Sequence, residues 1–154
     1  MNEPVDMIRF VADLVKRPKG KAAIVLTHDY GGQKQWATDL AVKTEAEHLP
    51  MLDIFSEQPQ LSNNLSLFTV SELFDFIHRQ SKKNIAIISG LEFLKSTWSG
   101  QISAKNQFAN HIQTWHRTPH ILFVIQYDTD IASYDFGRRY SYRFVVDQKD
   151  TFKL

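Results

Sequence analysis

Cysteine is absent from this sequence of 154 residues, and glycine and proline occur only six and five times. The missing cysteines exclude a disulfide scaffold, a thiolate zinc site and a cysteine nucleophile, and they fit a reducing compartment. No apolar run reaches the length of about 18 residues that a membrane-spanning helix needs. Residues Met1–Phe10 lack the basic start and the apolar stretch of a secretory signal. We therefore expect a cytoplasmic protein with no membrane contact.

An excess of charge of one sign is also absent. The chain has 18 Lys and Arg residues against 17 Asp and Glu residues, a formal net charge of +1. This balance gives no overall attraction for nucleic acid, so any such contact has to be a local patch. With 43% hydrophobic and 12% aromatic residues, the composition is that of one globular domain. We expect a single domain over residues 1–154, in which residues 1–19 form an N-terminal helical extension.

Apolar residues are patterned as strands and helices in alternation. Uninterrupted apolar runs predict strands buried on both faces, and helical spacing predicts amphipathic helices between them. The predicted strands cover residues 22–27, 50–54, 84–89, 120–126 and 140–147. The predicted helices cover residues 4–15, 33–48 and 102–115, with another that begins at the capping-box spacing Thr69-Val-Ser-Glu72. Residues 56–66 are polar and are predicted to form a mobile loop.

This alternation predicts an α/β fold: a three-layer, open and mainly parallel sheet of about five strands, with helices on both faces. Ligands of such sheets bind beyond the carboxyl ends of the strands. The loop after residues 22–27 is therefore the expected place for a phosphate-binding loop, with the pattern G-x-x-x-x-G-K-[ST].

Aligned on Gly32, that pattern places Thr27 at its first glycine, Gln33 at its lysine and Lys34 at its hydroxyl residue. Without the lysine no fixed cation meets the β- and γ-phosphates, and without the hydroxyl Mg²⁺ loses a ligand. Lys34 lies one residue late, and a shift of one residue on a helix turns the side chain by about 100°. We therefore predict a degenerate, vestigial site.

Two further strand ends bear on this site. Residues 84–89 end in Ser89 where a working NTPase has an acidic residue that orders Mg²⁺, and Glu92 follows as either a water-polarising carboxylate or a helix cap. Gln126 ends the next strand, either as a sensor of the γ-phosphate or as a polar residue that marks the strand end. The candidate nucleotide-binding residues are Gly31, Gly32, Gln33, Lys34, Glu92 and Gln126.

From about Lys21 onward the sequence resembles P-loop ATPases of the RecA/AAA type, and more narrowly the small P-loop component called BrxF of BREX-type phage-defence clusters. The resemblance lies in Ala86-Ile-Ile-Ser-Gly-Leu-Glu-Phe-Leu94, which looks like a Walker B strand with Ser89 in place of its Asp, and in the closing stretches 137–143 and 145–151. It implies a P-loop NTPase-like fold and partner subunits in a defence complex. The family's ATPase activity does not carry over, because the residues that define it are missing. We expect no catalytic residue and no cofactor.

A basic and aromatic segment at residues 136–144 interleaves Arg138, Arg139 and Arg143 with aromatic residues. This composition suits stacking on bases and pairing with phosphates, so the three arginines are candidate DNA contacts. The alternative is that the arginines cap a sheet edge while the aromatic residues enter the core. A smaller basic cluster lies near the N-terminus, where a solvated helix end is the alternative; it comprises Arg9, Lys16, Arg17, Lys19 and Lys21.

Metal and nucleophile motifs are missing from the sequence. The six histidines show no H-E-x-x-H pattern or other ligand spacing, so we expect no metal site. No G-x-S-x-G motif surrounds any serine, so none is predicted as a nucleophile.

Three functions stay open at this stage. The first is a non-catalytic, P-loop-like binding or assembly subunit of a BREX-like anti-phage system, which contacts other subunits, a second copy of itself or DNA. The second is an active NTPase that binds ATP and Mg²⁺ through an atypical loop with Lys34, Glu92 and Gln126. The third is a plain protein adaptor.

Overall fold

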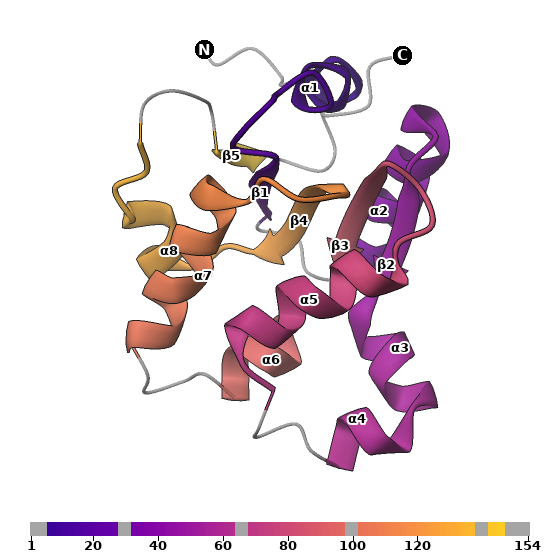
Figure 1. Cartoon of the computed structure of the whole chain (residues 1–154), viewed down its shortest axis with the longest axis vertical. Coiled ribbons are helices and arrows are strands. Elements are labelled where there is room, and N and C mark those ends of the chain that lie inside the picture. The colour runs from indigo at the N-terminus through magenta and orange to yellow at the C-terminus, as the bar shows by residue number, and fades with distance from the viewer. Residues whose placement is uncertain (1–5, 28–31, 64–67, 98–101, 138–141, 147–154) are drawn as a thin grey trace.

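A parallel five-stranded sheet forms the centre of the computed structural model, which describes residues 6–27, 32–63, 68–97, 102–137 and 142–146 (Figure 1). The strands lie in the order β2-β3-β4-β1-β5, and every neighbouring pair runs parallel. Their bounds are β1 Ala22–Thr27, β2 Glu47–Pro50, β3 Ile85–Ser89, β4 His120–Gln126 and β5 Arg143–Val146. The predicted α/β class is confirmed, as are the strands predicted over 22–27 and 120–126.

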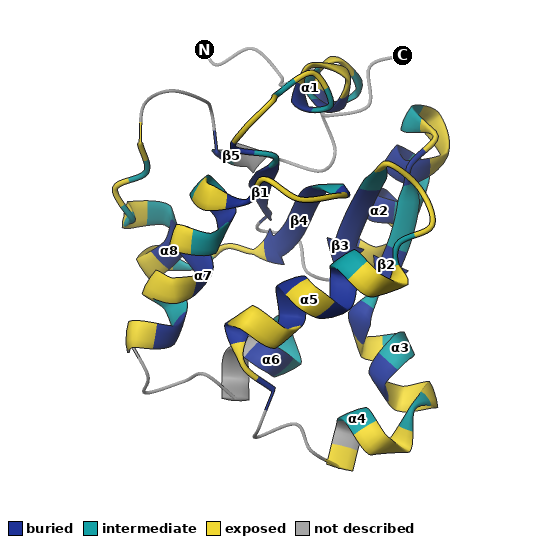
Figure 2. Ribbon diagram, viewed as in Figure 1, coloured by how far each residue is buried: buried dark blue, intermediate teal, exposed yellow. Residues whose placement is uncertain are grey.

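Helices cover both faces of this sheet, which gives the predicted three layers. The helix bounds are α1 Met7–Leu14, α2 Gln33–Thr44, α3 Met51–Glu57, α4 Pro59–Asn63, α5 Val70–Gln80, α6 Glu92–Thr97, α7 Ile102–Thr114 and α8 Thr129–Ser133. The side chains of β1 alternate: Ala23 and Val25 pack under α1 and α2, while Ala22, Ile24 and Leu26 pack under α5 and α7. Because both faces are covered, β1 is buried along its whole length and β4 over all but its two end residues (Figure 2).

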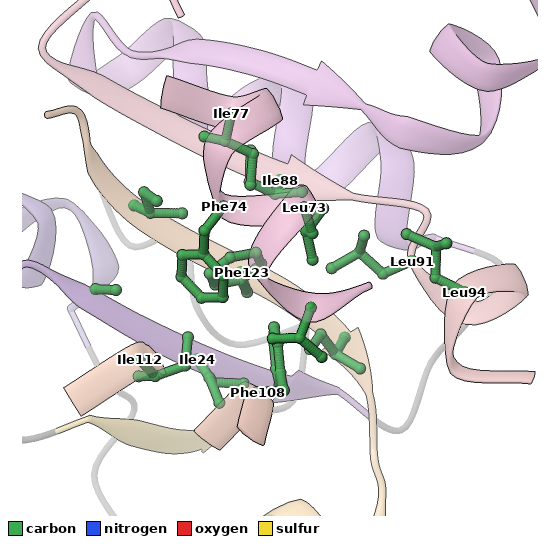
Figure 3. Packing of buried hydrophobic residues seen from close by; sticks show 14 of the residues in the cluster. Ile24, Leu73, Phe74, Ile77, Ile88, Leu91, Leu94, Phe108, Ile112 and Phe123 are labelled. Carbon is green, nitrogen blue, oxygen red and sulfur yellow. The ribbon is translucent and has the colours of Figure 1, made fainter. Parts of the chain in front are cut away.

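The larger layer of helices packs through an aromatic centre. Phe123 of β4 lies with its ring centroid 5.4 Å from that of Phe74 in α5 and 5.0 Å from that of Phe108 in α7 (Figure 3). All three side chains are almost completely buried. These contacts hold α5 and α7 against the middle of the sheet, near the strand ends that carry the candidate site.

The N-terminal helix α1 belongs to the smaller layer. Met7, Val11 and Leu14 recur at helical spacing, are buried, and share a cluster with residues of α2 and the sheet. Asp6 caps the helix by accepting a hydrogen bond from the Arg9 amide at 3.1 Å. The predicted N-terminal helix is thus present, and it covers part of the sheet.

The segment from 45 to 57 differs from the sequence prediction. Helix α2 ends at Thr44 because Glu45 adopts a left-handed conformation (φ 57°) and the Ala46 amide bonds back to the Ala41 carbonyl. The predictions of a helix through His48 and of a strand over 50–54 are therefore wrong: β2 comes earlier, and 51–57 is helical. Met51 and Phe55, four residues apart, are both buried, and a run this short fits either period.

Short helices also replace parts of predicted loops. The loop expected over 56–66 is wrong for the end of α3 and for α4, while residues 64–67 lie outside the described residues. The capping box at Thr69 is confirmed, since its hydroxyl accepts a hydrogen bond from the Glu72 amide at 3.2 Å. None of the helices in the described ranges has both the length and the apolar character that crossing a membrane requires.

Candidate functional site

Gln33, at the start of α2, is the central residue of the sheet's carboxyl edge. Its side chain is 3% exposed. The amide oxygen accepts a hydrogen bond from the Gly90 amide at 3.0 Å, and the amide nitrogen donates to Glu92 Oε1 at 3.0 Å. The residue that occupies the lysine position of the phosphate-binding pattern therefore joins α2 to the segment between β3 and α6.

Glu92 extends this connection to the next strand. The same Oε1 atom accepts a hydrogen bond from the backbone amide of Gln126 at 2.9 Å, whereas the Gln126 side chain is exposed. The structure thus brings together three of the predicted site residues, Gln33, Glu92 and Gln126. They meet through hydrogen bonds to one another, so the carboxylate predicted to polarise a water instead holds two N–H donors.

Gly90 forms the turn whose backbone amide donates a hydrogen bond to Gln33. Its φ of +71° lies in the left-handed region, and a Cβ atom added there would come within 3.2 Å of the Leu52 backbone nitrogen. A side chain would therefore strain the backbone and press on the start of α3. Glycine is needed here to present the Gly90 amide to Gln33.

Lys34 points toward α3. Its ammonium forms an ion pair with the Asp53 carboxylate, and both side chains are exposed. The two charges lie at a cavity of about 200 Å³, here called the α2–α3 cavity. Its lining also includes Gln33, Pro50, Leu52, Ser89 and Gly90. Lys34 is thus within the candidate site, but its charge is paired.

The structure describes two of the remaining residues at the phosphate-binding pattern, Thr27 and Gly32, but not Gly31. Thr27 is fully buried, and its hydroxyl oxygen has no hydrogen-bond partner among the described residues. Gly32 is the N-cap residue of α2, whereas Gly31 lies outside the described residues. A buried β-branched side chain therefore stands at the position of the pattern's first glycine.

Sequence reasoning missed a polar chain beside this edge. His48 of β2 contacts Ser89 of β3 through Nε2 and Thr38 of α2 through Nδ1. Burial lowers the pKa of His48 below its ordinary value of 6.5, the Lys34 charge lowers it further, and the Asp53 charge opposes both. No local motif marks this group, because it depends on the pairing of β2 with β3 and the prediction placed His48 in a helix.

Of the three arginines predicted to contact DNA, the structure describes one. Arg143 donates hydrogen bonds to the carbonyls of Ile131 (3.1 Å) and Tyr134 (2.7 Å), and its guanidinium lies over the Phe136 ring. It thereby caps the carboxyl end of α8. Arg138 and Arg139 lie outside the described residues, so DNA contact through them stays a prediction.

The N-terminal basic cluster divides between structural and exposed residues. Arg17 donates a hydrogen bond to the Gly20 carbonyl at 3.2 Å and lies over the rings of Phe10 and Tyr142, whereas Arg9 is exposed.

In the part of the chain that the structure describes, no three His, Asp or Glu residues are grouped to hold a metal ion. Neither a protein-family model nor a curated protein sequence matches the chain.

Proposed function

We propose that this chain is a P-loop-like pseudo-ATPase domain, non-catalytic toward nucleotides, that acts as a binding or assembly subunit of a multi-protein system. The observation that carries the proposal is the bridge from Gln33 to Gly90 and Glu92. A neutral amide stands where a nucleotide-binding loop has its cation, and both ends of that amide are bound to protein.

The electrostatics of the carboxyl edge support the same conclusion. A phosphate needs positive charge or free N–H donors, and a magnesium site needs available oxygen ligands. Here the Gly90 amide and Oε1 of the Glu92 carboxylate are bound within the chain, and Lys34 is paired with Asp53. Binding of MgATP would have to break these contacts, which opposes it energetically.

The strand order supports the resemblance to ATPases of the RecA/AAA type. In β2-β3-β4-β1-β5, strand β4 lies between β1 and β3, and β1 leads into α2 at the place of a phosphate-binding loop. The proposal is that the fold is kept for contact with partner subunits, as in the BREX-type defence clusters that the sequence resembles. Genes for a methyltransferase and a large ATPase beside this one would connect it to such a system, and their absence would argue for an adaptor of another kind.

Titration with a fluorescent ATP analogue and Mg²⁺ tests the non-catalytic assignment. We expect no saturable binding at millimolar nucleotide and no phosphate release, because the Gly90 amide and Oε1 of Glu92 are already hydrogen-bonded within the chain and Lys34 is paired with Asp53. The matched variants are Lys34→Ala, at the cavity, and Lys43→Ala, an exposed lysine at the other end of α2. Saturable binding that is lost in Lys34→Ala and kept in Lys43→Ala would contradict the proposal and support the atypical NTPase.

A further inference from the structure

A serine that lines the α2–α3 cavity faces a histidine from the neighbouring strand. Nε2 of His48 lies 2.6 Å from Oγ of Ser89, and Nδ1 lies 3.0 Å from the hydroxyl oxygen of Thr38. The Thr38 hydroxyl in turn donates to the Lys34 carbonyl at 2.9 Å. Three side chains therefore form one continuous chain of hydrogen bonds that ends at Ser89.

The proton positions in this chain follow from its other end, at Thr38. Thr38 has a single hydroxyl proton, which goes to the Lys34 carbonyl, so toward His48 its oxygen can only accept. Nδ1 of His48 then carries the imidazole proton and Nε2 has the free lone pair. Ser89 consequently donates its proton to Nε2, which is the arrangement that a histidine base needs to activate a serine hydroxyl.

The surroundings keep His48 in its neutral, basic form. Burial and the Lys34 charge lower its pKa, and Asp53 opposes them. His48 also lines a surface groove with Glu45 and Lys83, whose charges are opposite. A histidine whose pKa is lowered is unprotonated at neutral pH and is able to accept a proton.

The cavity provides a place for a substrate beside Ser89. Ser89 ends β3, is 1% exposed and lines the cavity, with Gly90 making the tight turn that follows. Pro50 and Leu52 supply apolar wall, and the Lys34 ammonium is the cation that lines the same space. A volume of about 200 Å³ has room for a short acyl chain.

We propose that Ser89 is a nucleophile activated by His48, and that it accepts a short acyl group from an ester. Ser89 Oγ bonds to the ester carbonyl carbon while its proton moves to His48 Nε2. The bond from that carbon to the alcohol oxygen then breaks, and His48 returns the proton to the departing alcohol. Water hydrolyses the acyl-serine by the same route, which releases the carboxylic acid. This activity goes beyond the assembly role and requires no nucleotide.

The full-length chain tests this with a fluorophosphonate probe and with p-nitrophenyl acetate. Attack of Ser89 on the probe forms an oxygen–phosphorus bond and expels fluoride. We expect one adduct per chain, mapped to Ser89 by mass spectrometry, and release of p-nitrophenol from the ester. Ser89→Ala should abolish both, and His48→Gln should slow both by about 100-fold or more. Ser56→Ala removes an exposed hydroxyl from α3, beside the cavity, and should react like the wild type.

The pH profile separates a catalytic histidine from a structural one. The labelling rate should rise with pH to a plateau, with its midpoint below 6.5, because only neutral His48 accepts the proton. Absence of an adduct on Ser89 in the folded wild type would overturn the proposal, as would equal labelling in a folded His48→Gln chain. The wild-type adduct is decisive even where a variant fails to fold. Nucleotide titration has a separate readout, so failure here is distinguishable from failure of the non-catalytic assignment.

Discussion

Gln33 shows how one substitution in a phosphate-binding pattern changes what the position does. A lysine there would present a cation to a ligand, whereas the amide of Gln33 offers one donor and one acceptor and places both inside the protein. The partly buried Gly90 amide and Glu92 carboxylate thereby gain partners that would otherwise have to come from solvent or ligand.

Replacing Gln33 with methionine should therefore destabilise the fold. The side chain keeps its length but leaves the Gly90 amide without its acceptor and Glu92 without one donor. We expect the free energy of unfolding to fall by about 2–4 kcal/mol, because each partner left unsatisfied costs about 1–3 kcal/mol. Urea unfolding followed by circular dichroism measures this.

Gln35→Met is the matched control for that substitution. Gln35 lies on the exposed side of the same helix turn, and its side chain donates a hydrogen bond to Asp39 at 2.8 Å. We expect this change to stay within about 0.5 kcal/mol of the wild type. Equal stability of the two variants would show that the Gln33 bridge contributes nothing to folding.

At the scale of elements, α1 has a larger part in the fold than a terminal helix usually has. It has three buried apolar residues and shares a cluster with α2 and with β1 and β4 of the sheet. Only α1 and α2 contribute helical residues to that cluster, among the described residues. Loss of α1 would therefore expose part of the sheet to solvent.

Truncation of one α1 side chain tests this role. Leu14 is fully buried, and Leu14→Ala should lower the free energy of unfolding by about 2–5 kcal/mol. Asp13→Ala, on the exposed side of the same turn, should change it by no more than about 0.5 kcal/mol. If both variants unfold like the wild type, α1 does not stabilise the sheet.

The elements that the sequence predicts well are those with a long and unambiguous apolar pattern. β1 and β4 are continuous apolar runs, and α5 has a capping box together with helical spacing. The segment 47–57 was assigned wrongly, because a four-residue edge strand and a seven-residue helix are too short for their periods to differ. The sequence prediction contains neither α6 nor α8, because helices of six and five residues are also too short to show a period.

The sequence predicts where the candidate site lies in the fold, but not which of its atoms form hydrogen bonds with one another. The rule that ligands lie at the carboxyl ends of parallel strands correctly grouped Gln33, Glu92 and Gln126. Which donor meets which acceptor depends on the turn at Gly90 and on the register between strands. The contact of His48 with Ser89 depends on a β2–β3 pairing that the sequence prediction did not contain.

At the scale of the whole molecule, two partly buried histidines make stability depend on pH. Burial is the main cause that lowers the pKa of both His48 and His120 below 6.5. As the pH falls below 6.5, the unfolded chain therefore binds more protons than the folded chain, so acid favours unfolding. Lys105 has its pKa raised, chiefly by its hydrogen bond to Asp130, so its contribution is present below about pH 10.5 and is lost above it.

We therefore expect the free energy of unfolding to be level from about pH 7 to 10 and to decline as the pH falls below 6.5. Urea titrations at a series of pH values measure this profile. The His48→Gln/His120→Gln chain should show a shallower acid decline than the wild type. His116→Gln, at an exposed histidine, should keep the wild-type profile. An unchanged acid slope in the double variant would contradict the assignment.

The strand order also determines when the sheet can form during synthesis. β1 lies between β4 and β5, and its register pairs Ala22 with Ile121 and Val25 with Phe144. The ribosome therefore releases this fully buried strand well before either of its partners. Until β4 and β5 have been made, Ala22–Thr27 is an unpaired apolar strand that can aggregate with other chains. Such long-range pairing folds slowly, which makes the nascent protein a natural client for chaperones that cover exposed strands.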